Sequence, residues 1–227
     1  MNVPKKEDNS LKQTEIIQNK GERTTFISHI HPRFVSEAAL KFVSTFCLGG
    51  LSALSFLVLA ITGVLLMFHY QPGENSAFSS LLNLSSVIPY GAILRNWHYW
   101  SGQIMVISVS MHMIRVVWTH SYKPPKQLNW LVGIGLLLLT LFMDFTGYLL
   151  RGSQESGAAA NVAVHLSQLI PMMGQPIAQI FFGKPSPLSG STLMVYVWHC
   201  VGLPVIALGL QLYHFWRVRR DGGVRPL

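Results

Sequence analysis

Charged residues are scarce in this chain of 227 residues. They make up 11% of it, whereas a soluble domain usually carries about 25%. Half of the residues are hydrophobic, so the composition favours a membrane protein over a soluble domain. The formal net charge of +8 comes from basic residues at the ends of apolar segments. This placement fits membrane lipid headgroups and argues against nucleic acid as a partner.

Cysteine is equally scarce, and both copies, Cys47 and Cys200, lie inside apolar runs. Two such residues provide neither a disulfide framework nor the spacing of a zinc site. The chain also has no GxGxxG, no P-loop and no HExxH, so the common signatures of nucleotide binding and of metalloproteases are missing. We expect Cys200 to be a small core residue.

Four apolar stretches are each close to the roughly 20 residues that a helix needs to cross the hydrocarbon of a bilayer. They cover 42–70, 93–118, 129–150 and 193–216. The predicted fold class is therefore all-α, a transmembrane four-helix bundle in residues 36–227 that follows a polar cytoplasmic segment in residues 1–35. Within the long connection before the fourth stretch, residues 159–182 are predicted to form short amphipathic helices on the membrane surface.

The basic residues of the connections predict an orientation. They are concentrated in the N-terminal segment, in the connection between the second and third stretches, and at the C-terminus. The long connection before the fourth stretch has only Arg151 and Lys184. The positive-inside rule then places both termini in the cytoplasm. We expect an integral protein of the bacterial cytoplasmic membrane.

Histidine inside a membrane span is costly, so the four histidines of the second and fourth stretches are candidate functional residues. His98 and His112 are fourteen residues apart, and His199 and His214 are fifteen apart. At about 100° and about 1.5 Å per residue, both spacings return to roughly the same helix face after about 21 Å. Because both stretches enter from the same side, His98 is predicted to be level with His199, and His112 with His214. Any one of them alone is as well explained by polar packing between helices.

Two facing imidazoles at each level are the axial ligand set of a haem iron without an open coordination position, a centre that transfers electrons. Zinc requires three or four ligands close together, which these spacings do not provide. The pattern therefore predicts two b-type haems enclosed by the bundle. A transporter or structural bundle without haem is the alternative.

Glycines repeat with the same period on the other two stretches. Gly49 and Gly63 are fourteen residues apart, as are Gly133 and Gly147. A porphyrin is flat and wide, so a helix that faces it has to lack a side chain at the point of contact. Close helix packing through small residues is the alternative.

The segments that carry these residues resemble cytochrome b of the quinol-oxidising bc and bf complexes. The resemblance is strongest to the short split form of chloroplast-type bf complexes and of bacterial menaquinol–cytochrome c reductases, and it extends from about His31 to Leu227. The matching segments are FCLGG, AITG, HYQP, ILRNWHYWSGQ, MHMIRV, KPPKQLNW, DFTGYLL, WHCVGLP and HFWRVRRDGGVRPL.

The resemblance implies a dihaem subunit of a respiratory or photosynthetic complex that carries electrons between an outer and an inner quinone site, with quinol and quinone as substrates. It implies that His98 and His199 hold the outer haem, and that His112 and His214 hold the inner haem. It also implies a second membrane subunit that supplies the C-terminal half, a Rieske iron–sulfur protein or a c-type cytochrome, and a dimeric complex.

The resemblance assigns further residues. It implies that Cys47 holds a third, c-type haem through a single thioether, the alternative being a buried cysteine of the core. Arg95, Arg115 and Lys123 fall where the family has basic residues near haem propionates or the inner quinone site. Their alternative is anchoring at the membrane surface.

The sequence also departs from the family. After GYLL, the segment from Arg151 to Val162 replaces a Pro-Trp-Asp-Gln segment, and Tyr99 stands where an arginine is usual. The first departure leaves open a second function, a dihaem membrane anchor that links the quinone pool to a non-Rieske acceptor such as multihaem cytochromes. No catalytic residue is assigned. Asp144 and Glu155 are candidates for proton handling, with a polar role at a helix end as the alternative.

Overall fold

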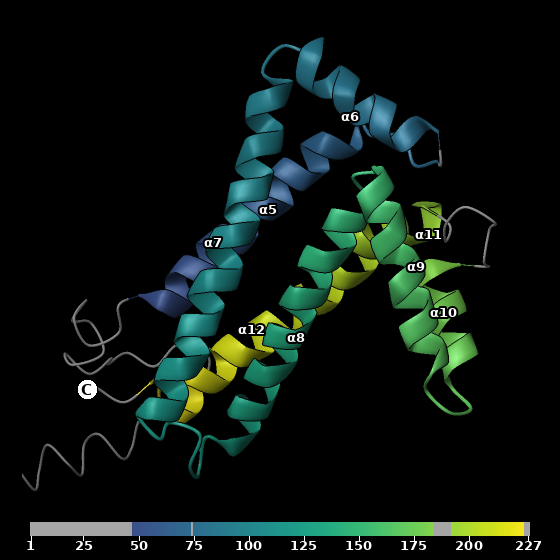
Figure 1. Cartoon of the computed structure of the whole chain (residues 1–227). Helices are drawn as coiled ribbons and strands as arrows, with labels where there is room; N and C mark the ends of the chain where they lie inside the picture. The colour runs from purple at the N-terminus through teal and green to yellow at the C-terminus, as the bar shows by residue number, and fades with distance from the viewer. Residues whose placement is uncertain (1–46, 74, 184–191, 225–227) are drawn as a thin grey trace, which may run out of the picture. The chain divides into compact units, whose positions relative to one another are not determined.

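The computed structural model describes residues 47–73, 75–183 and 192–224, all of which belong to the compact unit Glu37–Leu227. The polar segment expected at residues 1–35 lies outside the described residues. Within the described ranges the chain forms helices joined by turns, with no strand (Figure 1). The predicted all-α fold class is confirmed.

Four long helical segments match the four predicted spans. They are α5 (Leu48–Met67), α7 (Gly91–Trp118), α8 (Gln127–Leu149), and a fourth segment made of α11 (Thr192–Val197), the π-helical turn η1 (Trp198–Gly202) and α12 (Leu203–Asp221). By length and composition, α5, α8 and the fourth segment can each cross a membrane. Helix α7 passes the same test only together with α6 (Ser76–Ser86), from which it bends by 113°.

On the long helices, many of the buried side chains are hydroxyls, whereas most of the large apolar side chains are exposed. On α5, Ser52, Ser55 and Thr62 are buried, whereas Leu54 and Leu57 are more than half exposed. The same contrast occurs on the other spans, where buried Ser108, Thr140 and Thr146 alternate with exposed leucines and isoleucines. A soluble protein places its large apolar side chains in the core. The inverted pattern fits helices whose outer faces contact lipid.

The spans pack as two helix pairs. Helix α5 packs along α7, and α8 packs along α12, with α7 and α8 in contact between the pairs (Figure 1). Phe56, Met105 and Ala207 form a buried apolar cluster where three of the spans meet. Each lies near the middle of its span, so the centre of the bundle is packed with apolar side chains.

Helix α6 is not among the predicted elements, because its serine-rich sequence lacks the length and apolar content of a span. It is held by packing: Ala77 and Leu84 are almost fully buried. Gly91 starts α7 where the carbonyl oxygen of Leu84 occupies the place of a Cβ atom. A side chain at Gly91 is incompatible with this bend.

The amphipathic segment predicted at residues 159–182 forms two helices, α9 (Gln154–Gln168) and α10 (Gly174–Phe182). Helix α9 begins earlier than predicted, since Ser153 caps it by accepting a hydrogen bond from the backbone N–H of Ser156 at 3.4 Å. Buried Ala160 and Phe182 join the cluster formed by the ends of α8 and α11. These two helices therefore cover one end of the bundle.

Candidate functional site

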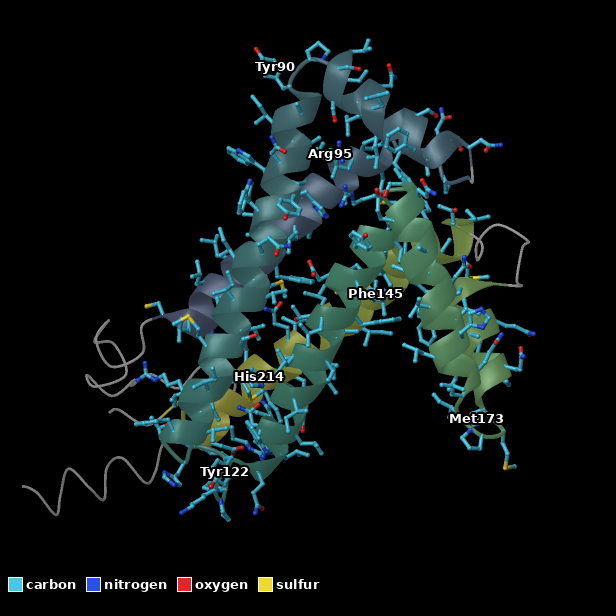
Figure 2. All side chains as sticks on the ribbon, in the orientation of Figure 1. Tyr90, Arg95, Tyr122, Phe145, Met173 and His214 are labelled. Atoms are coloured by element: carbon cyan, nitrogen blue, oxygen red, sulfur yellow. The ribbon has the colours of Figure 1, made fainter. Side chains whose placement is uncertain are left out.

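The four histidines lie at two levels of the bundle. At the first level, the ring centroids of His98 and His199 are 6.4 Å apart, with ring planes at 71°. At the second level, His112 and His214 both line a cavity of about 290 Å³. Figure 2 shows His214 toward the end of the bundle that carries Tyr122, away from Arg95. We refer to these as the 98/199 level and the 112/214 level.

The unequal spacing of the histidines is absorbed by the π-helical turn. His199 lies within η1 (Trp198–Gly202). A π-turn holds one residue more than an α-turn. The fifteen residues from His199 to His214 therefore span about as much helix as the fourteen from His98 to His112. Gly202 permits this turn, since a Cβ there meets the Trp198 ring at 2.5 Å.

Each predicted glycine lies against a different histidine. Ideal Cβ atoms built on the glycines approach the imidazole Cε1 atoms at the following distances: 2.9 Å for Gly147 and His199, 3.2 Å for Gly63 and His98, 3.5 Å for Gly49 and His112, and 3.6 Å for Gly133 and His214. The glycines thus make room for the imidazole rings. Contact between the same glycines and a porphyrin stays a prediction.

Two threonines complete the 98/199 level. The Oγ1 atom of Thr62 is 2.9 Å from Nδ1 of His98. The Oγ1 atom of Thr146 is 3.0 Å from Nδ1 of His199. Sequence reasoning missed both residues, although a signal was present: each directly precedes the second glycine of its helix, in AITG and DFTG.

At the 112/214 level no hydroxyl is hydrogen-bonded to a histidine among the described residues, although Ser52, Ser121 and Thr140 line the cavity. The residues that precede its glycines are Leu48 and Val132. Nδ1 of His214 is buried and has no side-chain hydrogen-bond partner among the described residues. The two levels therefore share their glycine contacts and differ in their hydrogen bonding.

The imidazoles of His98 and His199, whose ring centroids are 6.4 Å apart, would be the residues that hold a metal at the 98/199 level. No group of three or more His, Cys, Asp or Glu side chains suited to a metal ion occurs among the described residues. The chemistry is therefore that of a paired-imidazole site.

The predicted basic residues lie apart from one another. Arg95 donates from Nη1 to Oγ of Ser85 at 3.1 Å, and with Arg151 it lines a smaller cavity of about 160 Å³. Arg115 is buried one turn beyond His112. Lys123 is exposed in the connection between α7 and α8. Of the three, only Arg115 is both buried and close in sequence to a histidine of the site.

The remaining candidates lie near helix ends or between helices. Cys47 is exposed at the N-cap of α5, and Cys200 is half-buried within η1. Asp144 accepts a hydrogen bond from Gln103 at 3.4 Å, which links α8 to α7. Glu155 is exposed in the first turn of α9, where hydrogen bonding by Ser153 holds its pKa below the usual value. A charged carboxylate at this position stabilises the helix N-terminus.

The fold and the histidine pairs define a helical membrane protein with ligand positions inside its bundle. The family model for cytochrome b/b6/petB matches residues 34–222, and the chain belongs to this family. Membership implies haem b as a cofactor. The protein is accordingly an integral membrane protein, in agreement with its three to four apolar spans in the described ranges.

Comparison with individual proteins also finds members of the cytochrome b family. The chain is 35% identical to cytochrome b6 of Heliobacterium modesticaldum over 182 residues, which cover 80% of this chain and 85% of that protein. It is 29% identical over 200 residues to the menaquinol:cytochrome c reductase cytochrome b subunit of Geobacillus thermodenitrificans, covering 88% and 89%. A chain of a hyperthermophilic respiratory Complex III has the same fold, with a TM-score of 0.68 and 22% identity. That alignment covers 94% of this chain and about half, 55%, of the other.

Proposed function

We propose that this protein is the cytochrome b subunit of a quinol-oxidising membrane complex, and that it holds two haem b groups, one at each histidine level. The names of its relatives support the complex, since they include a cytochrome b6 and a menaquinol:cytochrome c reductase subunit. The single observation that carries the two-haem proposal is the pairing of imidazoles at two levels of one bundle. A haem with two imidazole ligands supplies one-electron transfer without an open position for oxygen.

Residues of the chain shape the two histidine levels in two ways. The glycines let the imidazoles approach α5 and α8 closely, and the apolar cluster of Phe56, Met105 and Ala207 separates the two levels. An apolar partition excludes water from the space between the levels. The protein would thus supply fixed orientation and a low dielectric, while the redox chemistry belongs to the cofactor.

The orientation with both termini in the cytoplasm is supported by charge. Lys126 donates a hydrogen bond to the carbonyl oxygen of Gly223, so the α7–α8 connection and the C-terminal end of α12 lie at the same end of the bundle. The basic side chains of these two segments are Lys123, Lys126, Arg217, Arg219 and Arg220. Such a concentration is typical of a cytoplasmic face. The 112/214 level lies toward this end and would be the inner one.

We also propose a third haem at Cys47. This residue is exposed at the start of α5, two residues before the glycine that contacts His112. An exposed thiol next to the 112/214 level is accessible for a thioether, which a buried core cysteine is not. Haem staining after denaturing electrophoresis tests this: the band stains in the wild type and not in Cys47→Ala, while the absorbance of the b haems is retained. A wild-type band without stain contradicts the third haem and leaves the other two intact.

Partner subunits are expected in either version of the function. A Rieske protein or c-type cytochrome, a second membrane subunit and dimerisation stay predictions of the resemblance. The rival version, a dihaem anchor with a non-Rieske acceptor, rests on the departure from the family between Arg151 and Val162, which includes the first part of α9. Purification of the intact complex distinguishes them, since a Rieske subunit supports the first version and multihaem cytochromes support the second.

The decisive test of the two-haem proposal is optical. The purified complex, reduced by a quinol, is expected to show b-type α-bands assigned to two haems per chain. Replacement of His98 or His214 by alanine is expected to remove one of the two. A colourless chain, or a haem content that neither replacement changes, contradicts the proposal.

A further inference from the structure

We propose that Thr62 and Thr146 are positioning residues that fix the protonation of His98 and His199 and lower the midpoint potential of the haem at the 98/199 level. The inference rests on the proposed function, since it requires a haem between these imidazoles. It concerns residues that sequence reasoning did not single out. They occur at one level of the bundle and not at the other.

The first step is the position of the threonine proton. A hydroxyl has one proton to donate and two lone pairs that accept. The Oγ1 atom of Thr62 donates to the carbonyl oxygen of Val58 at 2.7 Å. The Oγ1 atom of Thr146 donates to the carbonyl oxygen of Met143 at 3.0 Å. Each hydroxyl therefore donates its proton to a carbonyl oxygen of its own helix, and it can only accept a hydrogen bond from the histidine.

The second step is the tautomer of the imidazoles. Because each hydroxyl accepts, Nδ1 of His98 and Nδ1 of His199 must carry the hydrogen in the contacts of 2.9 and 3.0 Å. A neutral imidazole with hydrogen on Nδ1 has its free lone pair on Nε2. Both rings are thus prepared to bind iron through Nε2. The threonines are 4% and 2% exposed, so water does not compete for these hydrogen bonds.

The third step is the consequence for potential. A hydrogen bond donated from Nδ1 increases the electron density that the imidazole gives to the metal. Stronger donation favours ferric over ferrous iron and lowers the midpoint potential, which is sensitive to hydrogen bonding around the ligands. Leu48 and Val132 occupy the equivalent positions at the 112/214 level and have no hydroxyl. The contribution of a threonine hydroxyl is therefore confined to one level.

The experiment compares three variants of α8 in the purified complex by optical redox titration and by the low-spin haem signal in electron paramagnetic resonance. Thr146→Val removes the hydroxyl and retains the shape of the side chain. Thr146→Ser retains the hydroxyl. Thr140→Val is the matched control, because Thr140 is also buried and donates to its own helix, at 2.8 Å to the carbonyl oxygen of Leu136, with no histidine as partner.

We expect Thr146→Val to raise the potential of the 98/199 haem so that the ratio of reduced to oxidised haem at fixed potential changes about tenfold, equivalent to 59 mV for one electron. Thr146→Ser and Thr140→Val are expected to leave that potential unchanged. The 112/214 haem is expected to be unchanged in the two Thr146 variants, whereas Thr140 lines the 112/214 cavity and serves as a control for the 98/199 haem alone. Loss of the haem in Thr146→Val with retention in Thr146→Ser also supports the proposal, since the hydroxyl is then required.

Two results overturn it. One is a Thr146→Val complex with unaltered potential and resonance signal. The other is loss of the haem in both Thr146 variants, which makes the shape of the side chain, and not its hydroxyl, the requirement. Failure of the proposed function is seen separately, in a wild-type complex that lacks any haem signal sensitive to His199→Ala.

Discussion

The two histidine levels use the same helices and the same kind of glycine contact, but they differ in how closely the glycines approach and in their hydrogen bonds. Both take one imidazole from α7 and one from the fourth helical segment, and both set these rings against glycines of α5 and α8. At the 98/199 level the approach is close, at 2.9 and 3.2 Å, and threonines hold both rings. At the 112/214 level the approach is 3.5 and 3.6 Å, beside a cavity of about 290 Å³.

The difference shows that one ligand set can have two environments within a single bundle. The 98/199 level is tight and hydrogen-bonded, so its rings have little freedom. The 112/214 level is roomier, and its cavity extends to Gly222 and Gly223 beyond α12. Environment and not ligand identity then distinguishes the two histidine levels, which are the two proposed haem sites. The predictions below test this comparison.

The largest effect is expected from the ligands themselves. His199→Ala should remove the haem of the 98/199 level, and His214→Ala should remove the other, because each imidazole serves one level only. Haem b per chain, measured as the pyridine complex and counted apart from the haem proposed at Cys47, should fall from two to one in either variant. Loss of both haems in either variant would show that the levels do not form independently.

A deletion of one residue tests the π-helical turn. Removal of Val201 from η1 should convert the π-turn to an α-turn and leave His199 facing His98, so that both haems are retained. Removal of Ile107 from α7 should rotate His98 by about 100° relative to His112 and eliminate one haem. Optical spectra of the two deletion variants show how many b-type haems each one retains. Equal damage in both would contradict the role assigned to η1.

Replacement of a glycine by alanine should be tolerated better where the distance from its ideal Cβ atom to the histidine ring is longer. Gly147→Ala places a Cβ atom 2.9 Å from His199, and we expect a cost of about 1–3 kcal/mol. Gly133→Ala has 3.6 Å available and should be nearly neutral. Thermal loss of the haem absorbance in detergent measures both. A larger loss at Gly133 than at Gly147 would refute the view that the 98/199 level is the tighter one.

The smallest expected effect is a transfer of the threonine to the other level. Val132→Thr sets a hydroxyl next to Gly133, on the helix that faces His214. One new hydrogen bond should lower the potential of the 112/214 haem, with roughly a threefold change in the reduced-to-oxidised ratio, about 28 mV. Redox titration of the variant measures it, with Val132→Ala as the matched control. A rise in the potential contradicts the assigned direction.

The spans could be predicted from the sequence because long apolar segments and the spacing of histidines and glycines are periodic. The pairing of His98 with His199 follows from that periodicity and from the direction of the helices. The π-turn could not be predicted, since its extra residue is accommodated by local hydrogen bonding around Gly202 that no composition reveals. Helix α6 is short and serine-rich, and its stability comes from packing against other elements.

The threonines illustrate a different obstacle. Thr62 and Thr146 donate to their own helices, as serines and threonines in membrane helices commonly do. Thr140 does the same and has no hydrogen bond to a histidine among the described residues. In the sequence, Thr62 and Thr146 differ from Thr140 only in directly preceding a glycine of the repeat. That each of them reaches a histidine depends on the position of the partner helix, which the sequence does not give.

The division of the bundle into two helix pairs has a consequence for biogenesis. One pair, α5 with α7, contributes half of each level, and the other pair, α8 with the fourth segment, contributes the other half. On the proposed function, neither helix pair alone supplies both imidazoles of a level. Cofactor insertion would therefore join the two hairpins at two heights, and a ligand at one hundred times its dissociation constant adds about 2.7 kcal/mol of stability. The supply of haem during synthesis would then govern how much of the newly inserted chain escapes proteolysis.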